Sequence, residues 1–329
     1  MEFTQEVKIA TDPIYQKISK VMPEIEWSVH APYIHRINQL KKEKNAIVLA
    51  HNYQTPEIYH GIADVAADSL ALAIEAAKTN ADIIVMAGVH FMAETSKLMN
   101  PTKKVFLPDM QAGCSLASSI TGKDVRLLKE KYPGVPVVSY VNTSADVKAE
   151  TDVCCTSANA VKVVESLNVD KVIFLPDQYL ADYVAKNTKV KIISWKGTCI
   201  VHEQFTGKEI EDIKNQNPGI KVIAHPECPP DVIEASDFAG STSGMVKYVK
   251  ENQPKKVMLV TECSMSDNVE ADNPNVSFIK PCNLCPYMKK INLEKILDCL
   301  KNDTNEIILD NKTIEAARKS VIRMTEIGR

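Results

Sequence analysis

Short apolar runs alternate with amphipathic stretches along most of the chain. Runs of four to six mostly aliphatic residues are typical of buried parallel strands, and apolar spacing of three and four between them is typical of helices. The alternation therefore predicts an α/β fold with parallel sheets. Strands are expected at residues 46–50, 83–87, 104–107, 135–140, 171–175, 190–195, 221–224, 256–260 and 276–279.

Both ends of the chain lack strand-like runs. Residues 13–21 and 29–44 are amphipathic, and residues 293–300 and 313–327 have helical apolar spacing. We therefore expect helices at both ends, outside the alternating region. No Gly/Ser-rich linker or low-complexity segment interrupts the chain, so its domains are expected to pack closely.

One sequence plan recurs in segments that begin at Ala46, Val135 and Lys221, which indicates one structural unit used three times. In each segment a ring-bearing residue follows an apolar strand, and a second polar residue stands two positions further on. These pairs are His51/Tyr53, Tyr140/Asn142 and His225/Glu227. A hydroxyl residue then opens the next helical stretch (Ser69, Ser157, and Ser241 or Thr242), preceded four or five positions earlier by an Asp (Asp64, Asp152, Asp237).

A cysteine ends the second half of each repeat, at Cys114, Cys199 and Cys285, with spacings of 85 and 86 residues. Ligands of open α/β sheets bind beyond the carboxyl ends of the strands. Pseudo-threefold symmetry would bring three such ends to one central cavity. We therefore expect three similar three-layer αβα domains with small parallel sheets and one shared active site at their junction. Their expected ranges are 1–110, completed by helices in 290–329, then 111–196 and 197–289.

Composition narrows the class of partner. The 329 residues are 45% hydrophobic and 25% charged, as in ordinary globular proteins. The net charge of −3 favours neither nucleic acid nor a membrane surface, and no apolar run approaches the ~18 residues of a membrane span. The polar N-terminus does not resemble a secretory signal, so the nine cysteines predict a reducing cytoplasm and metal-binding or catalytic roles.

Cys114, Cys199 and Cys285 are the candidate metal ligands because they are equivalent in the three repeats. Three thiolates suit a cubane iron–sulfur cluster with one open iron, which can act as a Lewis acid in dehydration chemistry. The alternative is three buried structural thiols. Cys282 and Cys285 form a C-x-x-C pair, but a closed zinc site would need distant further ligands. Cys282 is therefore expected to be a spare thiol near the cluster, and Cys154, Cys155, Cys228, Cys263 and Cys299 core or incidental thiols.

Hydroxyls and polar pairs supply the rest of the candidate site. Only five arginines are present and none lies beside these motifs, so anionic ligands must be held in another way. Helix N-termini at the repeated hydroxyls offer free backbone N–H groups and a favourable dipole, beyond simple capping. His, Glu and Tyr of the pairs can transfer protons. His30, His35, His60 and His202 are expected to be structural, and the role of His90 is left open.

Nine motifs in order resemble one known family. They are AHNYQ, ADSL, AGVHFMAETSK, QAGCSLA, YVNTSA, TSANA, GTCIVHE, HPEC and CPYMKK, and they run from about Ala46 to Lys290. Together they are similar to quinolinate synthase, the A protein of the bacterial and archaeal route to NAD. The chain departs from that family at Ala67, where Gly is expected before Asp68-Ser69, and in having only Cys282 upstream of the third cysteine.

The resemblance implies a [4Fe-4S] cluster held by Cys114, Cys199 and Cys285 at the centre of three α/β domains. It implies an oxygen-sensitive cytoplasmic transferase that condenses iminoaspartate (iminosuccinate) with dihydroxyacetone phosphate to quinolinate, phosphate and water. A partner enzyme that supplies iminoaspartate is a further expectation. The implied catalytic residues are Glu227, His225, Tyr53, Tyr140 and His51, and the implied substrate-binding residues are His51, Ser69, Tyr140, Asn142, Ser157, His225, Glu227, Ser241 and Thr242.

Three other classes stay open from the residues alone. An iron–sulfur protein with a redox or regulatory role would need a fully ligated cluster, and the repeats offer no fourth equivalent ligand. An aconitase-like hydro-lyase would use the same open iron without a phosphate site. A metal-free binding protein would be colourless and contain no iron.

Overall fold

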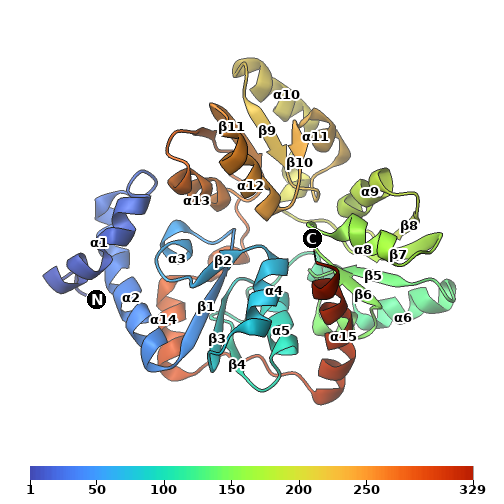
Figure 1. Cartoon of the computed structure of the whole chain (residues 1–329), viewed down its shortest axis with the longest axis horizontal. Helices are drawn as coiled ribbons and strands as arrows, with labels where there is room; N and C mark the ends of the chain where they lie inside the picture. The colour runs from blue at the N-terminus through green and yellow to red at the C-terminus, as the bar shows by residue number, and fades with distance from the viewer. Residues whose placement is uncertain (329) are drawn as a thin grey trace.

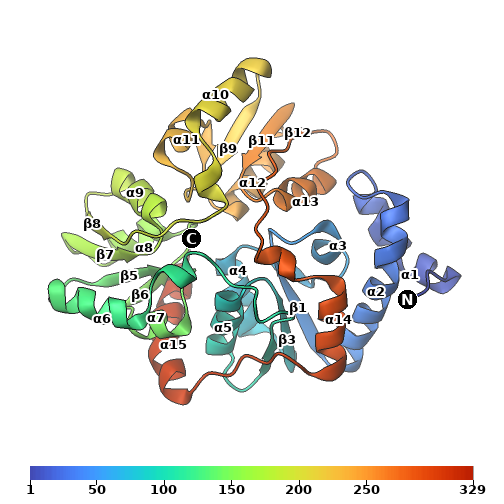
Figure 2. The same cartoon turned by 180° about the vertical axis from the view of Figure 1, so that it is seen from behind.

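The computed structural model describes residues 1–328 and has the α/β architecture expected from the sequence. Within these residues there are three small sheets, each of four parallel strands with helices packed around it. Figures 1 and 2 show the three sheet-containing units as lobes around the middle of the molecule, blue for the first, green for the second and yellow to orange for the third. The predicted fold class is therefore confirmed.

All three sheets have the same strand order. In the first, β1 (Ala46–His51) lies between β2 (Val65–Ala67) and β3 (Ile83–Ala87), with β4 (Lys104–Phe106) beside β3. The second repeats this order with β5 (Val137–Tyr140), β6 (Val153–Cys155), β7 (Lys171–Leu175) and β8 (Lys191–Ser194), and the third with β9 (Lys221–Ala224), β10 (Phe238–Ala239), β11 (Lys256–Val260) and β12 (Ser277–Ile279). The chain order reverses at β1, β5 and β9, where open α/β sheets bind ligands.

Helices connect the strands of each unit. They are α3 (Pro56–Tyr59), α4 (Ser69–Lys78) and α5 (His90–Met99) in the first unit, α6 (Gly122–Lys131), α7 (Ala145–Ala149), α8 (Ala160–Ser166) and α9 (Gln178–Asn187) in the second, and α10 (Gly207–Gln216), α11 (Pro230–Ala235), α12 (Thr242–Asn252) and α13 (Ser264–Asp272) in the third. Three short 3-10 helices, η1 (Ala117–Ser119), η2 (His202–Gln204) and η3 (Met288–Lys290), follow the last strand of each unit. The starts of α6 and α10 are specified locally, because Thr121 and Thr206 each form a capping box.

The chain ends are helical, as predicted. α1 (Gln5–Ile18) and α2 (Glu24–Glu43) precede the first sheet, and α14 (Leu293–Asn302) and α15 (Asn311–Ile327) follow the third. α14 packs on α2 and β3, whereas α15 packs on α7 and β6 of the second unit and on α5 of the first. The C-terminal helices therefore join the first and second units. The division of the chain into the three residue ranges given above stays a prediction.

The repeated aspartates have a structural role. The backbone N–H of Val48 donates to the Asp64 carboxylate (2.8 Å), that of Val137 to Asp152 (2.7 Å) and that of Val222 to Asp237 (2.9 Å). The N–H of each Asp donates in return to the carbonyl of the same valine. Each Asp therefore links the first strand of its unit to the segment leading into the short edge strand β2, β6 or β10.

The apolar core is divided unevenly among the units. One large cluster of buried side chains contains residues of the first unit, the second unit and the terminal helices. The third unit has two clusters of its own, one on each face of its sheet, centred on residues such as Val222 and Ile223. A further cluster around Val137 and Ile173 covers the other face of the second sheet. The third unit therefore shares less apolar core with its neighbours.

All nine predicted strands are present, with ends that differ by up to two residues. The strands β2, β6 and β10 were not predicted, because two or three residues are too few to show an apolar pattern. The first helix begins at Gln5, inside the region 1–44 that was expected to be helical and before its amphipathic stretch near Pro13. In the described part of the chain, every helix is too short or too polar to cross a membrane.

Candidate active site

A cavity enclosing about 700 Å³ of space between atoms, its open mouth included, lies where the three units meet. It is lined by residues of all three repeats. Twelve of the predicted site residues line it: His51, Tyr53, Ser69, Cys114, Tyr140, Asn142, Ser157, Cys199, His225, Glu227, Thr242 and Cys285. Ser241 lies outside the lining, and among residues 1–328 no lysine or arginine side chain contributes to it.

The paired polar residues reach the cavity from equivalent strand ends. His51 is the last residue of β1, Tyr140 is the last of β5, and His225 directly follows β9. These are the strands at which the order of each sheet reverses. Because residues two apart on an extended segment face the same way, the second member of each pair lies beside the first. The sheet topology therefore brings the three pairs together.

His51 and His225 share one backbone contact that fixes the ring tautomer. The N–H of Tyr53 donates to Nδ1 of His51 (3.2 Å), and the N–H of Glu227 donates to Nδ1 of His225 (3.3 Å). Burial lowers the pKa of His51 to about 4 and that of His225 to about 3, although nearby carboxylates act in the opposite direction. Both rings are therefore neutral at pH 7 and carry their proton on Nε2. Nε2 of His225 lies 3.2 Å from Oγ of Ser157, which can accept it.

Glu227 is buried between a phenol and two imidazoles. The hydroxyl of Tyr140 donates to Oε1, and Nδ1 of His202 lies 2.9 Å from Oε2. Burial alone raises the pKa of Glu227, but His225, His202 and the Tyr140 hydroxyl outweigh it and hold that pKa well below its usual range. The Glu227 side chain is therefore a carboxylate at neutral pH, despite being 3% exposed.

The two tyrosines are protonated hydrogen-bond donors. Burial and the charge of Glu227 raise the pKa of Tyr53 and of Tyr140 well above the usual value. The hydroxyl of Tyr53 lies 2.6 Å from Oγ1 of Thr261 and 3.4 Å from Nε2 of His202. Oδ1 of Asn142 is buried without a hydrogen-bond partner. The cavity therefore offers phenol donors and a free amide oxygen to a ligand.

The three cysteines occupy the same local position in each unit. Each stands three residues before a short 3-10 helix, and the N–H groups of the second and third residues after it lower the thiol pKa. Burial outweighs this effect, raising the pKa of Cys114 to about 12 and those of Cys199 and Cys285 above their usual value. Each of these thiols therefore becomes a thiolate at neutral pH only when a metal compensates the charge. Three soft donors in the lining of one cavity fit an iron–sulfur cluster.

The hydroxyls expected to cap helices behave differently in the three units. Asp68, not Ser69, caps α4, and Ser69 is the first residue of that helix. The helix α8 begins at Ala160 after Asn159, so the expectation that Ser157 opens it is wrong. Ser241 does cap α12, because its Oγ accepts the N–H of Gly244 (3.2 Å). Thr242 is the first residue of α12, and its Oγ1 accepts from Nδ2 of Asn52 (2.9 Å).

Comparison with known proteins gives the same assignment along nearly the whole chain. The family model described as "Quinolinate synthetase A protein" matches residues 35–326. Proteins named quinolinate synthase from Sinorhizobium fredii and Caulobacter vibrioides are 59% and 56% identical over 99% of this chain and 91% and 90% of their own lengths. One from Xylella fastidiosa is 58% identical over 89% of this chain and 87% of its own length. The chain belongs to the quinolinate synthase family. The family predicted from the nine motifs is therefore confirmed.

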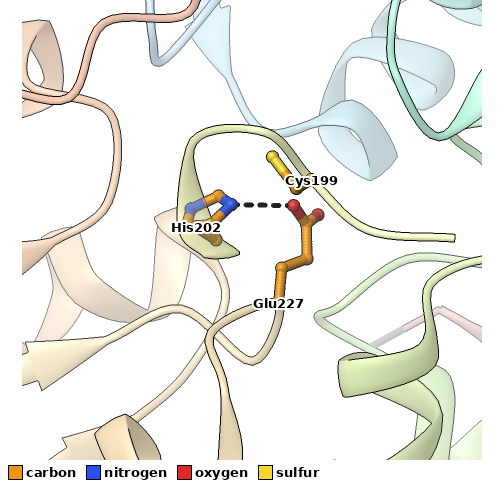
Figure 3. A group of neighbouring side chains, drawn as sticks. All are labelled: Cys199, His202 and Glu227. Carbon is orange, nitrogen blue, oxygen red and sulfur yellow. Dashed lines mark ion pairs between the residues drawn. The ribbon is translucent and has the colours of Figure 1, made fainter. Parts of the chain in front are cut away.

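His202 is a site residue that sequence reasoning missed in this family member. Its ring is 1% exposed, stacks on His225 with centroids 4.7 Å apart, and forms a group with Cys199 and Glu227 whose ligand atoms all lie within 4.8 Å of one another (Figure 3). The prediction that His202 is merely structural is therefore not supported by its surroundings. The signal was available: His202 stands three residues after Cys199, where the other units have Ala117 and Met288.

The remaining cysteines and histidines lie away from the cavity wall. Sγ of Cys282 is exposed and 3.0 Å from Sγ of Cys263 in the third unit, and all nine cysteines of the chain are free. Cys154, Cys155, Cys228 and Cys299 are buried in the core. His90 approaches Glu94 (3.7 Å) and does not line the cavity.

Proposed function

We propose that the protein catalyses the quinolinate synthase reaction, the condensation of iminoaspartate with dihydroxyacetone phosphate to quinolinate with loss of phosphate and water. One observation carries the proposal: three equivalent strand ends and three equivalent cysteines line a single cavity. Family membership supports it. The reaction would serve the synthesis of NAD in the cytoplasm, with another enzyme supplying iminoaspartate.

Glu227 is the proposed proton-transfer group. It is a buried carboxylate held against the Tyr140 hydroxyl and His202. A substrate oxygen that draws the Tyr140 proton away removes one stabilising hydrogen bond, which raises the basicity of Glu227 at the moment when enolisation needs a base. Tyr53 would help to move protons, and the neutral Nε2–H groups of His51 and His225 would donate to substrate oxygens. Tyr140 and Asn142 would orient intermediates.

Anionic groups would be bound by hydroxyls and backbone N–H groups. No lysine or arginine of residues 1–328 lines the cavity, whereas Ser69 and Thr242 line it as the first residues of α4 and α12. Such helix starts favour carboxylates and phosphate. Ser157, held by His225, would add a third hydroxyl, and Ser241 would shape the start of α12. This arrangement suits substrates that bring two carboxylates and one phosphate.

Cys114, Cys199 and Cys285 would hold the [4Fe-4S] cluster. When bound, a cluster with one open iron supplies a Lewis acid for the loss of water. A second candidate metal site overlaps the first, because Cys199, His202 and Glu227 form a mixed group that suits a single ion such as zinc. The two sites share Cys199, so they exclude each other.

Metal analysis of protein purified without oxygen tests the proposal. We expect about four irons and four sulfides per chain, and quinolinate formation that requires both substrates. Replacing Cys114, Cys199 or Cys285 with Ala should remove cluster and activity, whereas Glu227→Gln should keep the cluster and lower kcat at least about 100-fold. The contrary result is zinc at about one per chain without sulfide, or iron-replete protein that forms no quinolinate.

A further inference from the structure

An ion pair between a fully buried glutamate and a partly exposed lysine, outside the cavity wall, connects the third cysteine to the first unit. Oε1 of Glu262, a fully buried residue just after β11, lies 3.0 Å from Nζ of Lys289 in η3. Neither residue lines the cavity. Buried ion pairs contribute little net stability, since desolvation offsets their attraction. This pair therefore needs an explanation other than the stability of the fold.

The Glu262 carboxylate holds the backbone of Cys285. Its Oε1 accepts the N–H of Cys285 (3.3 Å), and its Oε2 accepts the N–H of Ser264 at the start of α13 (2.9 Å). The segment bearing the third candidate ligand is thus attached to the end of β11, the strand next to β9.

The Lys289 ammonium uses all three of its hydrogens on this connection. Besides Glu262, Nζ donates to the carbonyl of Tyr53 (2.8 Å) and to Oγ of Ser264 (2.6 Å). The N–H of Lys289 donates to the carbonyl of Cys285 (3.1 Å), which closes the turn after that cysteine. Lys289 therefore joins the segment of Tyr53 in the first unit to the segment of Cys285.

The second unit contains a related arrangement. Asp177 stands two residues after β7, as Glu262 stands two residues after β11, and it is fully buried. It caps α9 by accepting the N–H groups of Tyr179 (2.6 Å) and Leu180 (3.1 Å), and the N–H of Cys199 is among the groups that lower its pKa. The first unit has Val89 at this position, whose side chain cannot accept a hydrogen bond. In two of the three units, a buried carboxyl group two residues after the third strand interacts with the backbone N–H of the candidate ligand cysteine.

We propose that Glu262 and Lys289 are positioning residues that hold the backbone segments of Cys285 and Tyr53 against each other. The third candidate ligand and the phenol then keep a fixed distance and orientation. The effect of these residues on catalysis rests on the proposed function. Their effect on the position of Cys285 does not, and it is testable in protein that lacks the cluster.

The first test measures the alkylation of individual cysteines by iodoacetamide in full-length, cluster-free protein, read by peptide mass spectrometry. Loss of the Lys289 charge by itself raises the thiol pKa of Cys285 and slows its alkylation, so faster alkylation in Lys289→Met can come only from greater exposure of Cys285. Lys289→Met should nevertheless speed the alkylation of Cys285 about 10-fold and leave Cys114 unchanged. Lys289→Arg, which keeps donors, should restore most of the protection. The matched control is Lys290→Met, because the Lys290 side chain donates to Gln111 Oε1 (3.3 Å) and acts on Asp109, not on Glu262 or Tyr53, and its loss should have no effect.

A variant with a lone buried charge can fail to fold, so Glu262→Gln/Lys289→Met, which removes both charges, is the second variant. It should retain a native melting temperature and still expose Cys285. Alkylation of Cys285 within twofold of the parent in a folded variant would overturn the proposal.

The loaded enzyme gives the functional part of the test. Lys289→Met should lose iron to a chelator about 10-fold faster and have a lower kcat, whereas Lys290→Met should match the parent. If the parent itself binds no cluster, the proposed function fails while the alkylation result still decides the positioning role.

Discussion

His51 and His225 face the cavity as neutral donors, since backbone N–H groups occupy their Nδ1 atoms. In the unfolded chain each ring takes up a proton near pH 6.5, but in the folded protein only near pH 4 and pH 3. Protonation therefore favours unfolding. The stability that the neutral rings provide is fully present above pH 6.5 and is lost as pH falls toward 4 and 3.

Nitrogen-15 NMR of cluster-free protein checks this state of the histidines. We expect His51 and His225 to give the signals of neutral rings protonated on Nε2 at every pH from 8 down to 5. The free energy of unfolding should fall between pH 6.5 and 5, and less steeply in His225→Asn. Signals of a charged His225 ring at pH 6 would contradict the assignment.

Site residues differ in how far the sequence reveals them. His51, Tyr140 and His225 were predictable because they occupy the same position in the three sequence repeats, directly after or at the end of an apolar strand. His202, Glu262 and Lys289 were not predicted as site residues, because the contacts that give them a role, with Glu227, Cys285 and Tyr53, join residues from 23 to 236 positions apart in the chain. Local spacing places His202 three residues after Cys199, but it contains no information about the contacts of Glu262 and Lys289.

At the scale of elements, the long and fully buried strands and the terminal helices followed from apolar spacing, whereas β2, β6 and β10 did not. Those edge strands are two or three residues long, and their position is set by Asp64, Asp152 and Asp237 rather than by a hydrophobic run. The helix at Ser157 was placed too early for a similar reason: Asn159 accepts the N–H of Thr156 (2.8 Å) and keeps this segment out of α8.

Asp152→Ala tests this structural role of the aspartates. The variant leaves the N–H of Val137 without its charged acceptor (2.7 Å), so the free energy of unfolding should fall by about 1 kcal/mol. The effect belongs at the lower end of the usual range because solvent reaches the exposed Asp152. Asp152→Asn keeps an acceptor and should lose less.

Chemical denaturation of the three proteins measures the difference. Asp182→Ala, on the exposed side of α9, is the control and should change stability by only a few tenths of a kcal/mol. Equal stability of Asp152→Ala and the control would show that the contact contributes nothing.

At the scale of the whole molecule, the division of the core predicts unequal local stability. The first and second units share one apolar cluster with the terminal helices, whereas the third unit has clusters of its own. Cooperative opening follows such boundaries. The amides of β9 and β11 should therefore exchange with solvent at lower denaturant than those of β1 and β5, as one group. Native-state hydrogen exchange read by mass spectrometry measures this order, and simultaneous exchange of all three sheets would contradict it.

The position of one cysteine after each sheet has a consequence for maturation of the protein. Under the proposed function, a chain in which the sheet β9–β12 has not yet packed against the others presents two thiols at the centre, Cys114 and Cys199, and Cys285, which follows β12, arrives only when it has. Two thiolates hold a cluster less firmly than three, so the cofactor would be retained only by chains that have finished folding. Cofactor content would then act as a quality check: the fraction of chains carrying the cluster would measure the fraction correctly assembled.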